Sequence, residues 1–419
     1  MWRQPFVLAS LALAAAPALL DAQLAVRGDK VYTMSGAPVT DGVVLIRGGK
    51  IERVGPASQV SVPSGYKLLR AKVVTPGLVD AHSTVGLTGY LNQPQDQDML
   101  EKSAPIQPEL RAIDAYDGRD RLVGYLRGFG ITTIHTGHGP GALISGQTMI
   151  AKTAYDNVEQ ATIVPLAMVA ATLGEGARAE TGKSPGTRAK MIAMLREEFI
   201  KAQEYSKKRE KPVASKDKDD KDKDKDKEKE PPARELHMEM LARLVKGEVP
   251  LLVTVHRAND VLSTIRLGQE FHLKIVLDGV AEAYLVLPEI KASGYPVILH
   301  PPMYRSDGET ENLSMITATK LRDAGIPFAL QSGYEGYVPK TRVILFEAGI
   351  AAANGLSFEE ALASITSSAA KIIGVWDRVG SLEPGKDGDV ALYDGDPFEY
   401  TTHCTGVVID GQIVSTGKN

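Results

Sequence analysis

Short apolar runs alternate with longer amphipathic segments through the middle of the chain. The apolar runs, each typical of a buried strand, are residues 73–79, 131–135, 163–169, 250–255, 274–277, 296–299 and 328–330. Between them, the spacing of apolar residues predicts helices at 187–205, 258–270, 281–292, 315–324 and 339–353. This alternation predicts a parallel α/β domain, and at least seven strands favour a (β/α)8 barrel over an open sheet.

The two ends of the chain have a different pattern. Short β-type runs that stop at glycine-containing turns lie near the start, such as residues 43–47, and return near the end, such as 390–393. We therefore expect the two ends to meet in one small domain. The predicted organisation is a barrel over residues 75–375 and a composite β-sandwich built from residues 23–74 and 376–419.

The first residues have the layout of a secretory signal peptide. Arg3 precedes an apolar run from Phe6 to Leu20, and small residues lead to Ala22. The run is shorter than the roughly 20 residues that a bilayer span needs. We predict a signal peptide over residues 1–22, a periplasmic or secreted mature protein, and no membrane span after cleavage.

One segment inside the predicted barrel consists of charged residues alone. The run KDKDDKDKDKDKEKE occupies positions 216–230 and contains no apolar side chain. Without apolar burial, nothing offsets the entropy lost when such a segment becomes ordered. We predict a solvated, disordered insertion over residues 206–235.

The composition excludes several classes of protein. Of the 419 residues, 43% are hydrophobic and 24% are charged, which is typical of a globular protein. A formal net charge of −4 gives no basic surface for nucleic acid. Cys404 is the only cysteine, so an intramolecular disulfide and a cysteine-rich zinc site are both excluded.

Polar residues follow several of the predicted strands, which is where barrel enzymes place their chemistry. His82 ends the first strand, His135 and His138 end the second, and His256 and Asp278 follow two later strands. Neutral imidazole is the commonest metal ligand, so histidines at several strand ends indicate a metal site. The remaining histidines, which we interpret as structural, are His237, His272, His300 and His403.

Two distant stretches of the sequence resemble a known family. PGLVDAHS at 76–83 and GSLEPGKDGDVALYDGDPF at 380–398 are similar to signatures of the amidohydrolase superfamily, in the imidazolonepropionase-like branch that includes prolidase-like enzymes. The resemblance implies a barrel enzyme that hydrolyses amide, peptide-like or cyclic carbon–nitrogen bonds. It also implies one or two divalent ions, usually zinc, that polarise the carbonyl and activate a water molecule.

The resemblance implies a set of metal ligands in this chain. His82 and His256 match histidine ligands of the family, and Asp278 stands where a third histidine is expected but could bind a metal through oxygen. Two other positions differ, because Thr84 stands where a second histidine is expected and Ala170 stands where a lysine is expected. The ligand set implied for this chain is therefore His82, His256 and Asp278.

The resemblance also places a catalytic base, and the ends of the predicted strands supply candidate substrate-binding residues. The family's base position falls on Ser332, and Glu335 is a carboxylate three residues further on. Tyr334 and His138 are the expected substrate-binding residues. Lys152 ends a segment similar to one in this branch of the family, and we interpret it as a strand-end cation.

Three functions are consistent with this sequence. The first is a hydrolase with a divalent metal such as zinc and a small-molecule or peptide-like substrate. The second is a non-catalytic relative, with or without a metal, that acts as a subunit of a homo-oligomer or of a hetero-oligomer with an intact amidohydrolase. The third is a protein that binds a small ligand at the barrel mouth without turning it over.

Overall fold

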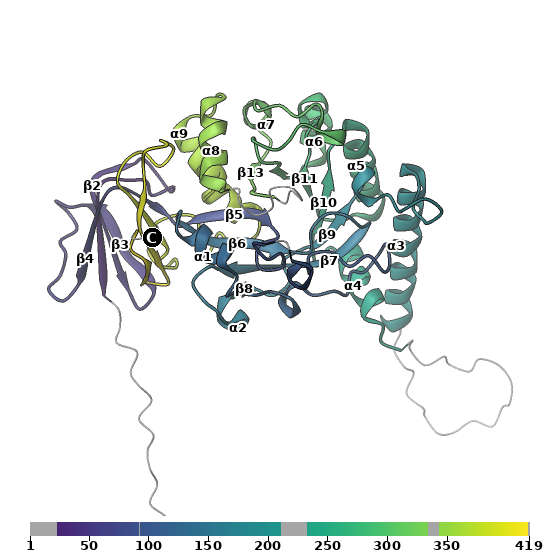
Figure 1. Cartoon of the computed structure of the whole chain (residues 1–419), viewed down its shortest axis with the longest axis horizontal. Coiled ribbons are helices and arrows are strands. Elements are labelled where there is room, and N and C mark those ends of the chain that lie inside the picture. The colour runs from purple at the N-terminus through teal and green to yellow at the C-terminus, as the bar shows by residue number, and fades with distance from the viewer. Residues whose placement is uncertain (1–22, 92, 211–232, 334–342, 418–419) are drawn as a thin grey trace, which may run out of the picture.

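A barrel and a smaller β-domain make up the described part of the chain, which in this computed structural model comprises residues 23–91, 93–210, 233–333 and 343–417 (Figure 1). The predicted signal peptide and residues 211–232 of the predicted insertion lie outside these ranges. Within the described ranges, no helix has both the length and the apolar character needed to cross a membrane.

Eight strands form the barrel, in the order β5–β6–β7–β9–β10–β11–β12–β13, and β8 pairs with β7 beside them. The seam between β5 and β13 closes where the backbone N–H of Gly333 donates to the carbonyl of His82 at 3.0 Å. The predicted α/β barrel is confirmed. The strand bounds are β5 (Leu78–Ser83), β6 (Ile131–Gly137), β7 (Ile144–Lys152), β8 (Thr162–Val164), β9 (Val169–Thr172), β10 (Leu251–Val255), β11 (Ile275–Gly279), β12 (Val297–Leu299) and β13 (Phe328–Leu330).

Strand β7 runs antiparallel to both of its neighbours, so the ring is not wholly parallel. The apolar pattern did not predict this strand, because Gln147, Thr148 and Lys152 interrupt its apolar residues. Every residue of β7 is nevertheless buried, and these polar side chains form hydrogen bonds inside the protein. The single strand predicted at 163–169 is divided between β8 and β9.

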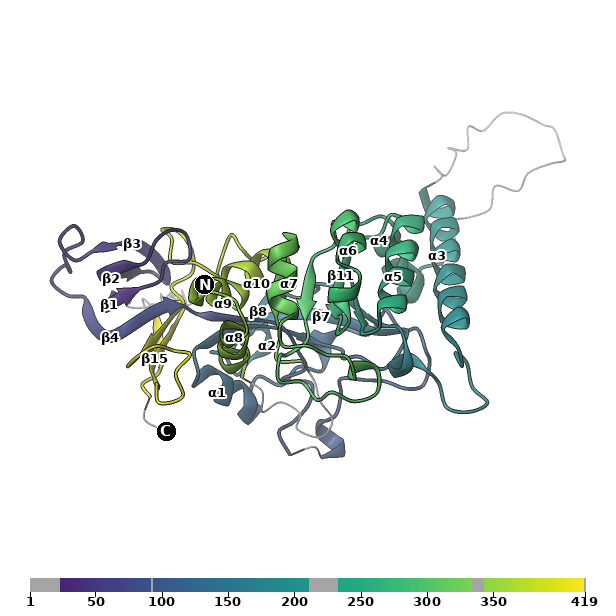
Figure 2. The same cartoon turned by 90° about the horizontal axis from the view of Figure 1, so that it is seen from above.

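Helices cover the outside of the ring along β10 to β13 (Figures 1 and 2). The helix predicted at 187–205 continues to Glu210, so it enters the range assigned to the insertion. The helix predicted at 281–292 begins only at Leu287. The helix bounds are α1 (Arg121–Arg127), α2 (Val158–Ala161), α3 (Arg188–Glu210), α4 (Leu236–Val245), α5 (Ala258–Phe271), α6 (Leu287–Ser293), α7 (Thr317–Ala324), α8 (Ile344–Ala353), α9 (Phe358–Ser364) and α10 (Ser367–Ile372).

The small domain is a seven-stranded sheet to which both ends of the chain contribute, as predicted. Its order is β16–β15–β14–β4–β1–β2–β3, so the late strand β14 pairs with the early strand β4. A single residue, Gly77, separates β4 from the first barrel strand. A Cβ atom at this position would lie 2.2 Å from Thr132 Oγ1, which explains why glycine is needed here. The bounds are β1 (Leu24–Val31), β2 (Val39–Arg47), β3 (Lys50–Pro56), β4 (Lys67–Pro76), β14 (Val390–Tyr393), β15 (Cys404–Ile409) and β16 (Gln412–Ser415).

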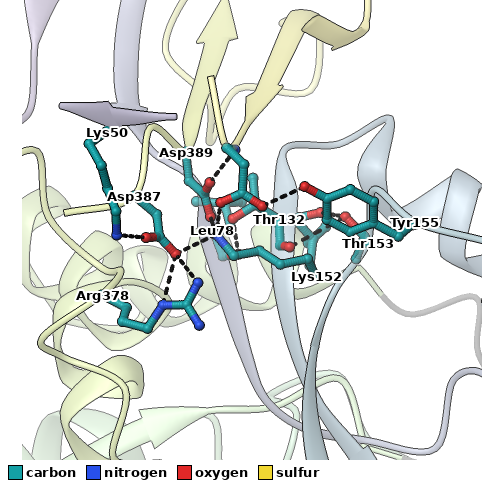
Figure 3. Close-up of polar contacts among 11 residues, drawn as sticks. Lys50, Leu78, Thr132, Lys152, Thr153, Tyr155, Arg378, Asp387 and Asp389 are labelled. Atoms are coloured by element: carbon teal, nitrogen blue, oxygen red, sulfur yellow. Dashed lines mark hydrogen bonds and ion pairs between the residues drawn. The ribbon is translucent and has the colours of Figure 1, made fainter. Parts of the chain in front are cut away.

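A buried ion cluster joins the barrel to the β-domain (Figure 3). Lys152 Nζ lies 2.5 Å from Asp389 Oδ2, 2.9 Å from Asp387 Oδ2 and 3.1 Å from Asp410 Oδ1, and the lysine side chain is 2% exposed. Lys50 also pairs with Asp387. Because β7 is antiparallel, Lys152 ends at the opposite side of the barrel from the strand-end histidines. It is a link between the two domains and not a cation at the barrel mouth.

The ion cluster predicts a loss of stability in acid. Burial acts to raise the pKa of Asp387, but the charge of Lys152 and the hydrogen bond from Lys50 lower it to about 2. A carboxylate with a lower pKa in the folded chain than in the unfolded chain stabilises the fold above about pH 4, and this contribution disappears as the pH falls to about 2. Burial raises the pKa of Asp389, so its titration acts in the opposite direction.

We expect the thermal unfolding midpoint of Asp387→Asn to fall less steeply than that of the unchanged protein between about pH 4 and pH 2. Asp41→Asn is the matched control, because Asp41 forms an ion pair with Arg27 at the exposed surface. Such a pair contributes little to stability. Parallel curves for Asp387→Asn and the unchanged protein would show that the Asp387 carboxylate does not stabilise the fold.

Candidate active site

A cleft opens where strands β5, β10, β11, β12 and β13 end. The structure brings together three predicted site residues in it, His82, His256 and Asp278. Tyr334 and Glu335 lie outside the described residues. The lining residues are His82, Ser83, Thr84, Pro140, Thr254, His256, Asp278, Gly279, His300, Pro301, Tyr304, Gln331 and Gly333.

His82 and Asp278 form a buried pair on the wall of the cleft. His82 Nδ1 lies 2.9 Å from Asp278 Oδ1, and because a carboxylate can only accept, the ring nitrogen donates. Burial acts to lower the pKa of His82, but the charge and the hydrogen bond of Asp278 raise it above the usual histidine value. Burial acts to raise the pKa of Asp278, but His82 and two further donors lower it. Each partner therefore stabilises the charged form of the other.

Both oxygens of the Asp278 carboxylate accept hydrogen bonds from protein donors. Besides His82, its Oδ1 accepts from Gln331 Nε2 at 2.8 Å, and its Oδ2 accepts from Thr254 Oγ1 at 2.6 Å. All four residues come from different strands or strand ends, so the network fixes them relative to one another. This arrangement makes Asp278 the residue that orients His82. It leaves His82 Nε2, a buried atom, without a hydrogen-bond partner among the described residues.

His256 lies beside this pair and directly follows β10. Burial lowers the pKa of His256, so its ring is neutral, and its Nδ1 has no hydrogen-bond partner in the described part of the chain. The ring is nearly parallel to that of Tyr304, with the centroids 6.4 Å apart. A Cβ atom on Gly279 would lie 2.7 Å from His256 Cε1, so the glycine makes room for the imidazole. The carbonyl of His256 accepts from Glu282 N at 2.9 Å.

The metal ligands implied by the resemblance do not form a complete site. Within the described ranges, no group of three or more His, Cys, Asp or Glu side chains is placed to hold a metal ion. Asp278 already accepts from three donors, and the buried ring nitrogens of the predicted set without a partner among the described residues are His82 Nε2 and His256 Nδ1. A catalytic zinc usually needs three protein ligands and an open position. The described residues do not fit that requirement.

The position of the family's base, Ser332, pairs with an aspartate that sequence analysis missed. Its hydroxyl donates to Asp80 Oδ2, and its backbone N–H donates to Asp80 Oδ1 at 3.0 Å. Burial raises the pKa of Asp80 to about 6 despite these hydrogen bonds. Asp80 is an acidic residue between the apolar residues Val79 and Ala81 of a buried strand, and that pattern was the available signal. The pair joins β5 to the segment after β13 at the barrel seam.

Three further histidines, His135, His138 and His300, differ from their predicted roles or locations. Both ring nitrogens of His135 are bonded, one to a carbonyl and one to a hydroxyl, so it offers no free ligand atom. His138 is buried and packs against Gly146, but it is not among the residues that line the cleft. His300, which we interpreted as structural, does line the cleft. Its place directly after β12 was the signal that could have identified it.

Comparison with known proteins gives a consistent result. A family model for the amidohydrolase family matches residues 297–415. The imidazolonepropionase of Rhizorhabdus wittichii is 25% identical over 398 residues, which cover 88% of this chain and 92% of that protein. An amidohydrolase, tasK, of Hapsidospora irregularis is 23% identical over 402 residues, and the match covers 88% of this chain but only 39% of that longer protein.

The similarity extends to solved structures. The crystal structure of an amidohydrolase from Thermotoga maritima MSB8 superposes with a TM-score of 0.85 and 28% identity, covering 94% of this chain and all of that one. The chain combines a barrel whose strand-end cleft is lined by imidazoles with a β-domain built from both chain ends. The chain belongs to the amidohydrolase superfamily.

Proposed function

We propose that the protein hydrolyses a carbon–nitrogen bond in a small amide-like or peptide-like molecule, with His82 as the proton-transferring residue and Asp278 as the residue that orients it. The observation behind the proposal is the state of the His82 ring. Asp278 holds Nδ1 at 2.9 Å, while Nε2 has no partner among the described residues and His82 lines the cleft. A carboxylate–imidazole pair of this kind positions a general base.

The proposed reaction uses residues already placed in the cleft. In its neutral form with a proton on Nδ1, His82 accepts a proton at Nε2 from a water molecule while the water oxygen bonds to the substrate carbonyl carbon. The carbon–nitrogen bond then breaks as Nε2 returns that proton to the leaving nitrogen, giving a carboxylic acid and an amine. His256 in the tautomer with a proton on Nδ1 donates a hydrogen bond to the developing oxyanion.

A divalent ion, the usual cofactor of the superfamily, would polarise the carbonyl and activate water when bound. From the predicted ligand set, the described residues would hold it through one ring nitrogen each of His82 and His256. Because two nitrogens fall short of the usual three ligands, we assign the proton transfer to His82 itself.

Turnover of a panel of N-acyl amides and cyclic amides tests this proposal. We expect the purified protein to hydrolyse at least one of them, His82→Ala to abolish that turnover, and His403→Ala to keep it. His403 is a matched control because its side chain is 78% exposed and lies in the β-domain. Equal turnover by His82→Ala and the unchanged protein would contradict the assignment of His82.

A second candidate function is that of a non-catalytic subunit beside an intact amidohydrolase. The observation in its favour is that the family ligand set is incomplete among the described residues, with Asp278 engaged by three protein donors. It predicts co-purification with a relative that has the full ligand set, together with no turnover by the isolated chain. Stable binding of a small amide without turnover, and without a partner, would instead support the ligand-binding function.

The apolar run of residues 6–20 with small residues up to Ala22 supports the further proposal that the chain is exported. Amino-terminal sequencing of the protein from a periplasmic or culture fraction tests it. Export predicts a new terminus near Gln23, whereas an intact Met1 in every fraction would contradict it.

A further inference from the structure

We propose that His135 and Thr148 are positioning residues that hold the backbone of β5 next to His82 through a chain of hydrogen bonds across the barrel. This inference rests on the proposed function of His82. His135 lies on β6 and Thr148 on β7, and neither lines the cleft. Both are completely buried, so water does not compete for their hydrogen bonds.

The chain of hydrogen bonds connects β5, β6, β7 and the residue that directly precedes β9. His135 Nδ1 lies 2.7 Å from the carbonyl oxygen of Ala81, and His135 Nε2 lies 2.7 Å from Thr148 Oγ1. Thr148 Oγ1 in turn accepts from the backbone N–H of Met168 at 3.1 Å. Ala81 directly precedes His82, so the last bond of the chain ends one residue from the proposed base.

The chemistry of the partners fixes the position of the ring proton of His135. A carbonyl oxygen can only accept, so the proton of His135 is on Nδ1. Burial lowers the pKa of His135 to about 3, so its ring is neutral and Nε2 has a lone pair. Nε2 therefore accepts from the Thr148 hydroxyl, and that hydroxyl oxygen accepts from Met168. The tautomer with its proton on Nδ1 satisfies both ring nitrogens, whereas the other tautomer leaves Nδ1 without a proton to donate to the Ala81 carbonyl.

His135 thus fixes the backbone next to His82, while Asp278 fixes the His82 ring itself. The ring centroids of His82 and His135 are 5.8 Å apart, so a shift of the His135 ring moves the surroundings of His82 directly. On the same strand, the backbone carbonyl of His82 accepts from Gly333 N at 3.0 Å. The backbone on both sides of the His82 side chain is thus bonded, and only its ring faces the cleft. Removing the Thr148 hydroxyl would leave His135 Nε2 buried and unpaired.

The test compares Thr148→Val, which removes the hydroxyl at nearly constant volume, with Thr148→Ser, which keeps it. Both are made in the full-length chain with nitrogen-labelled histidine, and NMR follows the ring nitrogens of His82 and His135. We expect Thr148→Val to shift the His82 signals and to lower kcat for the amide substrate by about 10- to 100-fold with little change in KM. Thr148→Ser restores both readouts.

Thr264→Val is the matched control. Thr264 is also buried and its hydroxyl donates to Asp260 O at 2.8 Å, but it lies on helix α5 and outside the cleft. Thr264→Val removes a buried hydroxyl but leaves the hydrogen bonds of His135 and Thr148 in place, so the His82 signals should stay unchanged. If Thr148→Val and Thr264→Val leave the His82 signals equally unaffected, the positioning role is overturned.

Two outcomes separate this inference from the proposed function. If the unchanged protein hydrolyses no amide, the proposed function fails, whereas the NMR signals still decide whether His135 and Thr148 hold β5. If Thr148→Val does not fold, the tautomer of His135 in the unchanged protein decides. A proton on Nδ1 supports the chain of hydrogen bonds, and a proton on Nε2 overturns it.

Discussion

Lys152→Met is expected to lower the free energy of unfolding by about 3–5 kcal/mol. Lys152 is 2% exposed and lies within 3.1 Å of three aspartates, so the substitution leaves Asp387 and Asp389 buried with less positive charge to balance them. Burial acts to lower the pKa of Lys152, but the three aspartates raise it above the usual lysine value, which shows that they stabilise its charge. Urea unfolding followed by circular dichroism measures the effect.

Lys50→Met is the matched control for that measurement. Lys50 pairs with the same Asp387, but its side chain is 52% exposed. We therefore expect Lys50→Met to lower the free energy of unfolding by only about 0–1 kcal/mol. A similar cost for both variants would contradict the account, because it would mean that burial of Lys152 among the three aspartates has no special importance. A cost below about 1 kcal/mol for Lys152→Met would do the same.

Asp278→Asn is expected to lower kcat for the amide substrate by about 10²- to 10⁴-fold. The amide side chain keeps the size of the carboxylate, but it no longer stabilises a positive charge on His82. Its nitrogen can also face Nδ1, which would drive the ring into the wrong tautomer. Because Asp278 accepts from three donors, one amide oxygen cannot replace both carboxylate oxygens. Steady-state kinetics at several pH values measures the loss.

Asp260→Asn provides the comparison for that experiment. Asp260 is also a buried aspartate, and it pairs with Arg188 outside the cleft. Its substitution should reduce stability but keep most of kcat. If Asp278→Asn keeps as much activity as Asp260→Asn, Asp278 does not orient the base.

The sequence predicted most of the architecture because burial leaves a clear pattern in it. Strands β10 to β13 are short, wholly or mainly apolar runs separated by amphipathic helices, and both ends of the chain read as β-structure. Strand β7 was missed because its buried residues include Gln147, Thr148 and Lys152. Polar residues of this kind are buried only when partners elsewhere in the chain satisfy them, and those partners cannot be identified from local spacing.

Three residues of the cleft were predicted from the sequence, but the hydrogen bonds that they form were not. His82, His256 and Asp278 follow predicted strands, and the barrel brings them to one cleft as expected. Their spacing in sequence gave no sign that Asp278 would use both oxygens on neighbouring side chains. The role of Lys152 depended on strand direction, because a reversed strand places its end on the opposite side of the barrel. The direction of β7 is set by its pairing with β6 and β9, which local sequence patterns do not reveal.

Turnover measured together with metal content tests the central claim most directly. The protein is treated with a chelator, its bound zinc and other divalent ions are determined by elemental analysis, and kcat for the amide substrate is measured on the same samples with His82→Ala beside it. We predict that kcat is independent of metal content and is lost in His82→Ala. A kcat that rises in proportion to bound metal and vanishes on chelation would contradict the claim that the His82–Asp278 pair is the reaction centre.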